Sequence, residues 1–210
     1  CGDLNADGFE DAFVASSMNY PFRYGVNSVL LNDGKKFHDA EFILGVEPRP
    51  GGRTAQPWLT IDCDKTTDEL MKKVVEGRTG EITVWGSLGS RSSVMFDYDD
   101  DGDLDIITSE FGDMPLILRS DLAQKHDIRF GKVSNRSGIG AVLTLHAGDK
   151  TLLRSYDGRV GYLSQGIPRL YVGIGEENQV DSIEVAWPNG TKQVFDGPWS
   201  PGTTIQLSED

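Results

Sequence analysis

The chain has 210 residues, enough for one large or two small domains. Its formal net charge of −13 excludes nucleic-acid binding as the main function, because a phosphate backbone needs a basic surface patch. No apolar run approaches the ~18 residues of a membrane-spanning helix, so the sequence predicts no membrane span. The 25 glycines and 9 prolines favour short elements joined by tight turns.

Two short acidic segments stand out, residues 3–11 and residues 97–105, which we call loop one and loop two. Both follow the pattern D-x-[DN]-x-D-G-x-x-D, and each leads into an apolar run typical of a strand. Asp3 of loop one aligns with Asp97 of loop two, an offset of 94 residues. The two segments therefore form an internal repeat.

The repeated pattern predicts one Ca²⁺ site in each loop. Calcium prefers about six to eight oxygen ligands, and side chains at loop positions 1, 3 and 5 converge when the backbone curls around the ion. The glycine at position 6 permits the sharp turn, position 7 offers its carbonyl, and the acid at position 9 completes the ring. The predicted ligands are Asp3, Asn5, Asp7, the carbonyl of Phe9 and Asp11 in loop one, and Asp97, Asp99, Asp101, the carbonyl of Asp103 and Asp105 in loop two.

The loops are not EF-hands, because position 12 is Val14 or Thr108 where an EF-hand has a bidentate glutamate. The ions would therefore act as structural staples that tie a turn to a strand, with no catalytic role. The alternative is a pair of solvated acidic turns, since Asp, Asn and Gly favour turns in any case. Repetition at the same five positions favours calcium.

The first part of the chain predicts short strands and one helix. Segments rich in β-branched and aromatic residues predict strands at 12–17, 28–32, 37–44, 93–96, 104–110 and 114–119. A helix is expected at 68–76, capped by Thr66 or Thr67 and ended by Gly77. The prolines and glycines around it predict an irregular insertion at about 47–92.

The second part reads as a separate β domain. Strands are expected at 127–133, 141–147, 151–156, 169–174, 182–186, 192–196 and 203–208, with hairpin turns at 148–149 and 188–190. We therefore expect a mainly β protein with two domains, 1–125 and 126–210, the second a small antiparallel sandwich or barrel.

Particular motifs resemble known families. The acidic loops followed by apolar strands resemble the FG-GAP or VCBS repeat of integrin-α-like β-propellers. Segments 134–141, 161–165, 173–175, 180–185 and 187–190 resemble the ASPIC/UnbV domain, in the expected order. Together they resemble a cartilage-acidic-protein-like secreted protein, bacterial UnbV-type relatives included.

The resemblance implies propeller-like blades with calcium loops, a secreted, cell-surface or periplasmic location, and an adhesion or scaffold role. Its implied partner is an extracellular protein or a carbohydrate, and no settled catalytic activity is implied. Two blades cannot close a propeller ring, and open sheets leave their edges unpaired. Either the chain is a piece of a longer propeller, or the edges are covered by the insertion, the C-terminal domain or another copy through self-association.

Several other residues carry weaker signals. Tyr156, Arg159, Tyr162 and Gln165 mix aromatic and polar groups that suit a carbohydrate or peptide, although the base rate for short motifs favours a packed β-turn. A disulfide between Cys1 and Cys63 and two free thiols both remain open. The alternative function is an enzyme or biosynthetic accessory protein acting on a carbohydrate or natural product, as UnbV-type proteins suggest.

Overall fold

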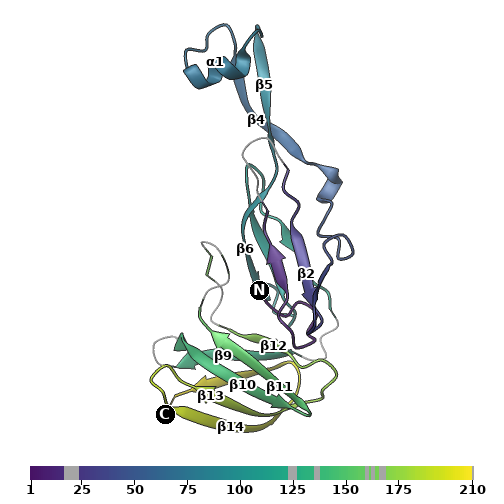
Figure 1. Ribbon diagram of the computed structural model, residues 1–210, viewed down its shortest axis with the longest axis vertical. Helices are drawn as coiled ribbons and strands as arrows, with labels where there is room; N and C mark the ends of the chain where they lie inside the picture. Colours follow the sequence, from purple (N-terminus) through teal and green to yellow (C-terminus); the bar gives the residue numbers. More distant parts are fainter. Residues whose placement is uncertain are drawn as a thin grey trace.

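The computed structural model describes residues 1–16, 24–122, 127–134, 138–158, 161, 164–165 and 169–209, with the backbone alone for 127–134. Of the chain, 46% is strand and 6% helix, which confirms a mainly β protein. Figure 1 shows an elongated molecule with three parts: an arm at one end, a central part, and a C-terminal domain at the other end.

The central part contains two three-stranded antiparallel sheets. One has the order β1-β2-β3, with β1 at Ala12–Val14, β2 at Ser28–Asn32 and β3 at Phe37–Asp39. The other has the order β6-β7-β8, with β6 at Ser90–Phe96, β7 at Asp105–Glu110 and β8 at Ile117–Leu118. Apolar side chains from both sheets share one core, made by Leu4, Phe13, Val29, Ala40, Val46, Met95, Leu104 and Ile106.

Four predicted strands are clearly shorter than expected, those at 12–17, 37–44, 114–119 and 169–174. The segment predicted at 37–44 leaves the sheet after Asp39, because the amides of Leu44 and Val46 bond back to the carbonyls of Ala40 and Glu41, both at 2.9 Å. These local bonds form turns that leave Ile43 86% exposed. The segment predicted at 114–119 contains Pro115, which has no amide to donate, and only β8 pairs.

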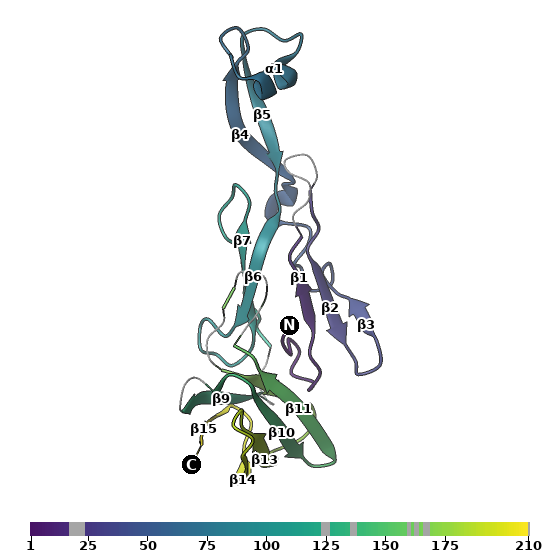
Figure 2. The same cartoon turned by 60° about the vertical axis from the view of Figure 1, so that its left-hand side comes forward.

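The arm corrects the prediction of an irregular insertion at 47–92. β4 (Ala55–Asp62) and β5 (Glu81–Ser87) form a long antiparallel hairpin, and α1 (Glu69–Val75) lies at its tip (Figure 2). Apolar and polar residues alternate over residues 59–62 of β4 and 81–84 of β5, a strand pattern that the neighbouring prolines and glycines obscured. An isolated hairpin is only marginally stable, and burial of Val75 in α1 and Ile61 in β4 supports this one.

The helix of the arm begins with a different cap from the one predicted. Asp68 accepts hydrogen bonds from the amides of Leu70 and Met71 at 2.8 and 3.1 Å, so the predicted caps Thr66 and Thr67 are wrong. Gly77 follows the helix with a φ of 73°, as its predicted role requires. With seven residues, α1 is far too short to cross a membrane, and the described chain offers no other helix that could.

The C-terminal domain is a sandwich of two sheets. The four-stranded sheet has the order β11-β10-β13-β14, with strands at Lys150–Tyr156, Ala141–Ala147, Val180–Ala186 and Lys192–Trp199. The three-stranded sheet has the order β12-β9-β15, with strands at Tyr171–Gly173, Asp127–Ser134 and Thr203–Ser208. β15 pairs in parallel with β9, which departs from the all-antiparallel prediction.

The core of this domain lies between its two sheets. Leu143, Leu145 and Ile183 come from the four-stranded sheet, while Val172 and Leu207 come from the other. Buried residues alternate with less buried ones along β10, as expected for a sheet with one face inside. Because none of the sheets closes on itself, the sandwich is the correct one of the two predicted architectures.

A buried ion pair joins the two central sheets at the end nearest the arm. Arg49 precedes a short 3-10 helix at Pro50–Gly52, and its guanidinium pairs with the carboxylate of Glu110 at the end of β7. The two side chains are 3% and 0% exposed. Ser90 accepts from Arg49 at 3.0 Å and donates to Glu110 at 2.6 Å, while Thr108 donates to the same carboxylate at 2.5 Å.

The same network reaches the first sheet. Arg49 also donates to the hydroxyl of Tyr24 at 3.1 Å, and Tyr24 donates to Glu47 at 2.5 Å. The Glu47 carboxylate accepts in turn from the amide of Asn27 at 3.0 Å. Burial, together with the proximity of Glu47, raises the pKa of Tyr24 to about 12, so this hydroxyl keeps its proton at neutral pH.

Cys1 and Cys63 are both free thiols. Cys63 directly follows β4 near the tip of the arm, and the chain begins near the C-terminal domain. The fold therefore places these two cysteines in different parts of the molecule.

Candidate metal centres

Loop one and loop two have the same backbone conformation. The residue at position 4 has a positive φ in both, 56° at Ala6 and 60° at Asp100. The glycine at position 6 has a φ of 97° in loop one and 106° in loop two. Such angles favour glycine, so the shared glycine is explained by the turn that both loops make.

The first aspartate of each loop holds the turn with both carboxylate oxygens. Asp3 accepts from the amide at position 5 at 3.0 Å and from the glycine amide at position 6 at 2.9 Å. Asp97 accepts from the same two positions of loop two, both at 2.9 Å. The two loops thus use the same internal bonds.

The last aspartate of each loop ties the loop to its sheet. Asp11 accepts from the amide at position 2 at 2.8 Å and from the amide of Asn32, at the end of β2, at 2.7 Å. Asp105 accepts from position 2 of its own loop at 3.0 Å and from the amide of Ser120, just past β8, at 2.9 Å. These four aspartates, Asp3, Asp11, Asp97 and Asp105, are all buried.

Loop two brings three carboxylates together. Oxygens of Asp97, Asp99 and Asp105 all lie within 4.8 Å of one another, the only acidic group this tight among the described residues. Asp101, a fourth predicted ligand, is not in this group. Asp103 is buried, and its Oδ1 has no hydrogen-bond partner in the described part of the chain. The three converging carboxylates are an all-oxygen set that fits a hard divalent cation.

Loop one differs from loop two at position 3, where it has an amide side chain. Asn5 donates from Nδ2 to Oδ2 of Asp7 at 2.9 Å, and the amide of Phe9 donates to Oδ1 of Asp7 at 2.8 Å. Loop one therefore has no third carboxylate at that position. Its predicted donors are still all oxygens, and the amide oxygen of Asn5 is a ligand that calcium accepts.

Burial disfavours the charged form of four carboxylates in the two loops. Loss of solvation raises the pKa of Asp3 to about 6 and, together with the charge of Asp101, that of Asp103 to about 6. Burial likewise raises the pKa of Asp11 and Asp105. Two carboxylates ~4 Å apart repel each other by about 4 kcal/mol at an effective dielectric constant of 20. A bound cation would offset both costs.

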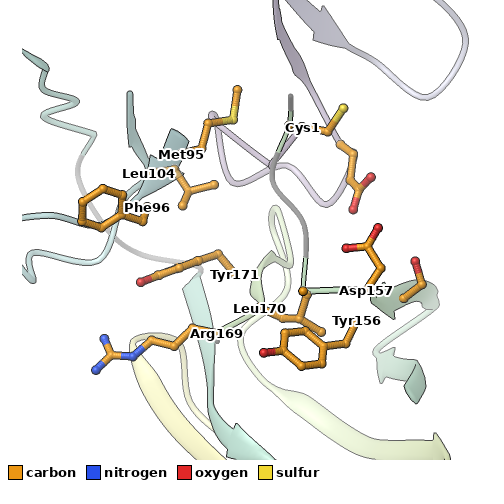
Figure 3. A pocket seen from close by; sticks show the side chains of 13 residues that line it. Cys1, Met95, Phe96, Leu104, Tyr156, Asp157, Arg169, Leu170 and Tyr171 are labelled. Atoms are coloured by element: carbon orange, nitrogen blue, oxygen red, sulfur yellow. The ribbon is translucent and has the colours of Figure 1, made fainter. Parts of the chain in front are cut away.

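A cleft of about 520 Å³ lies between the central part and the C-terminal domain (Figure 3). Met95, Phe96 and Leu104 line it from the central part, while Tyr156, Asp157, Arg169, Leu170 and Tyr171 line it from the C-terminal domain. The sequence did not reveal it, because its two walls are about 50 residues or more apart in the chain and meet only in the fold.

The predicted ligand group of Tyr156, Arg159, Tyr162 and Gln165 is only partly assembled. Tyr156 is buried and lines the cleft. Gln165 is exposed and is not part of the cleft lining. Arg159 and Tyr162 lie outside the described residues. The cleft therefore places Tyr156 beside partners that the sequence did not predict.

Fold and loops define the protein as a mainly β chain in which two repeated aspartate-rich loops precede a C-terminal β-sandwich. Residues 131–210 match the family model described as ASPIC and UnbV, so the C-terminal domain is an ASPIC/UnbV domain. The comparison with curated proteins gives no match.

Proposed function

We propose that the protein is a calcium-stabilised binding module that works outside the cell, with one Ca²⁺ in each loop. The observation that carries the proposal is the shared loop structure: the same positive φ angles and the same carboxylate–amide bonds recur 94 residues apart. A loop that served only as a turn would not need converging carboxylates such as those of Asp97, Asp99 and Asp105 in loop two.

The loop residues would each supply oxygen. In loop two the converging carboxylates of Asp97, Asp99 and Asp105 would hold the ion, joined by Asp101 and the carbonyl of Asp103. In loop one the set would be Asp3, Asn5, Asp7, the carbonyl of Phe9 and Asp11. The ion would supply a cross-link with a double positive charge, and the chain itself ties each loop to its sheet through Asp11 and Asp105.

The two central sheets, each connected to one such loop, support a propeller-like blade architecture of the FG-GAP or VCBS type. That architecture and the calcium loops favour a secreted, cell-surface or periplasmic location, where free calcium is high enough to fill modest sites. The partner we propose is an extracellular protein or a carbohydrate. The cleft beside Tyr156 and Tyr171 offers aromatic and carboxylate groups suited to a sugar.

Calorimetric titration with calcium tests the proposal through stoichiometry. We expect two bound ions for the natural sequence and one each for Asp97→Asn and Asp3→Asn, with an affinity loss at the altered site greater than the ~10–100-fold typical of outer-sphere changes. Glu69→Gln is the matched control, because it removes one negative charge from the exposed helix of the arm. Absence of calcium binding by the natural sequence would overturn the proposal.

A further inference from the structure

Loop one lies directly against the C-terminal domain. The amide of Gly173, at the end of β12, donates to Oδ2 of Asp3 at 2.9 Å. The amide of Gly175 donates to the carbonyl of Ala6 at 3.1 Å. The first aspartate of the loop thus bonds both within its own loop and to the other domain.

Two cationic side chains of β11 add to this contact. Nη2 of Arg154, whose side chain is 7% exposed, donates to the carbonyl of Gly8 at 2.8 Å. The ammonium of Lys150 lies 3.4 Å from the carbonyl of Asp7 and 3.1 Å from that of Ile174. Both cations contact main-chain carbonyls, so they do not occupy the side chains of the predicted ligands Asn5 and Asp7.

The fit between loop one and the C-terminal domain depends on close backbone approach. A Cβ atom on Gly173 would overlap the backbone of Ala6. A Cβ atom on Gly8 would lie 3.2 Å from the carbonyl oxygen of Gly173 and 3.3 Å from Leu152. A side chain at position 173 would therefore push loop one away from this surface.

Loop two contacts the same domain in a different way. Arg169 lies 3.5 Å from Asp100, and both side chains are partly exposed, 37% and 76%. An exposed ion pair of this kind contributes little, typically below about 1 kcal/mol. Loop two also meets Tyr171, which lies at the main chain of Asp97. The hydrogen bonds from the amides of Gly173 and Gly175 belong to loop one.

We propose that loop one is a calcium-controlled latch between the central part and the C-terminal domain. This inference rests on the proposed function, because it assigns a regulatory role to one of the two calcium sites. Calcium in loop one fixes the backbone that Gly173, Gly175, Lys150 and Arg154 recognise. Without calcium, the acids of the loop repel each other, the carbonyls of positions 4 to 6 move, and these contacts are lost together.

The coupling works in both directions. Asp3 is at once a predicted calcium ligand and the acceptor of the Gly173 amide. If calcium strengthens the docking of the domain by some factor, docking must strengthen calcium binding at loop one by the same factor. Couplings of this type typically lie in the range of about 5–150-fold.

The exchange rates of the Gly173 and Gly175 amides report whether loop one is docked on the C-terminal domain. Calorimetry on the same samples measures calcium binding. For the natural sequence we expect calcium to slow exchange at both amides by about 5–150-fold relative to excess EGTA. Asp97→Asn, which disables loop two, keeps this effect. Asp7→Asn, which disables loop one, abolishes it.

Two variants break the latch without altering a predicted ligand. Gly173→Ala introduces the overlap with Ala6, and Arg154→Met removes the donor to Gly8 without adding bulk at the contact. Both are expected to bind two ions, with the affinity of loop one lowered by the coupling factor and that of loop two unchanged. Exchange at the amide of Leu145 shows whether the sandwich core remains folded. If Gly173→Ala unfolds the sandwich, Arg154→Met alone tests the latch.

The two hypotheses fail separately. Two bound calcium ions, with equal exchange at Gly173 and Gly175 in calcium and in EGTA, would overturn the latch and leave the calcium-binding module intact. An unchanged affinity of loop one in a folded Arg154→Met would also overturn the latch. Calorimetry that detects no calcium binding would overturn both.

Discussion

Excess EGTA is expected to lower the melting temperature of the protein by about 10–20 °C compared with saturating calcium. A site at 100 times its dissociation constant adds about 2.7 kcal/mol to stability, and the two loops provide two sites. For a chain of this size each kcal/mol shifts the melting temperature by about 2–4 °C. Differential scanning calorimetry in both buffers measures the shift.

The controls separate calcium from general ionic effects. The double variant Asp3→Asn, Asp97→Asn is expected to melt at one low temperature in either buffer. Magnesium is expected to restore little stability, because it demands a small octahedral site and gives up its water reluctantly. Identical melting curves for the natural sequence in millimolar calcium and in EGTA would contradict the prediction.

Glu110→Gln is expected to lower the free energy of unfolding by about 3–5 kcal/mol. The change leaves the buried guanidinium of Arg49 without its charged partner, and an uncompensated buried charge is the costly outcome. Asp113→Asn is the matched control. It removes one carboxylate from the Arg53–Asp113 pair, whose arginine is 57% exposed, and should cost less than about 1 kcal/mol.

Urea unfolding of the variants, carried out in saturating calcium, measures this difference. The double variant Arg49→Met, Glu110→Leu should be more stable than Glu110→Gln, because it removes both charges and fills the space with apolar atoms. A free energy of unfolding for Glu110→Gln within about 0.5 kcal/mol of the natural sequence would show that the pair does not hold the two sheets together.

Elements with a clear local pattern were predictable from sequence. β10 and β15 have the predicted bounds, and apolar and polar residues alternate over residues 143–147 and 204–208 of these strands. The repeated loops were also visible, since each carries its own turn-forming residues within nine positions. Local chemistry decides the structure at these places.

Features built from distant residues were not predictable. The buried pair of Arg49 and Glu110 joins residues 61 positions apart, and Arg49 lies among prolines and glycines that suggest only a loop. The contact between Asp3 and Gly173 spans 170 positions. A glycine at the end of a strand gives no sign in the sequence that another domain approaches it.

The hairpin of the arm was missed from the sequence for a different reason. Its strands alternate correctly, with Leu59 opposite Val84 and Ile61 opposite Ile82, yet prolines and glycines before and between them suggested irregular structure. Pairing between the two strands outweighed that local signal. Propensity is a weak guide where cross-strand contacts settle the fold.

The central part is held at its two ends by different chemistry. Near the arm its two sheets are joined by protein groups alone, through Arg49 and Glu110. Near the C-terminal domain each aspartate-rich loop bonds to its own sheet, and Asp3 of loop one also bonds to Gly173 of the C-terminal domain. If loop one is the calcium-controlled latch proposed above, a fall in calcium would release the C-terminal sandwich from the central part while the arm kept its direction. A partner that bridges arm and sandwich would then be released by a change in the medium, with no chemical modification of the protein.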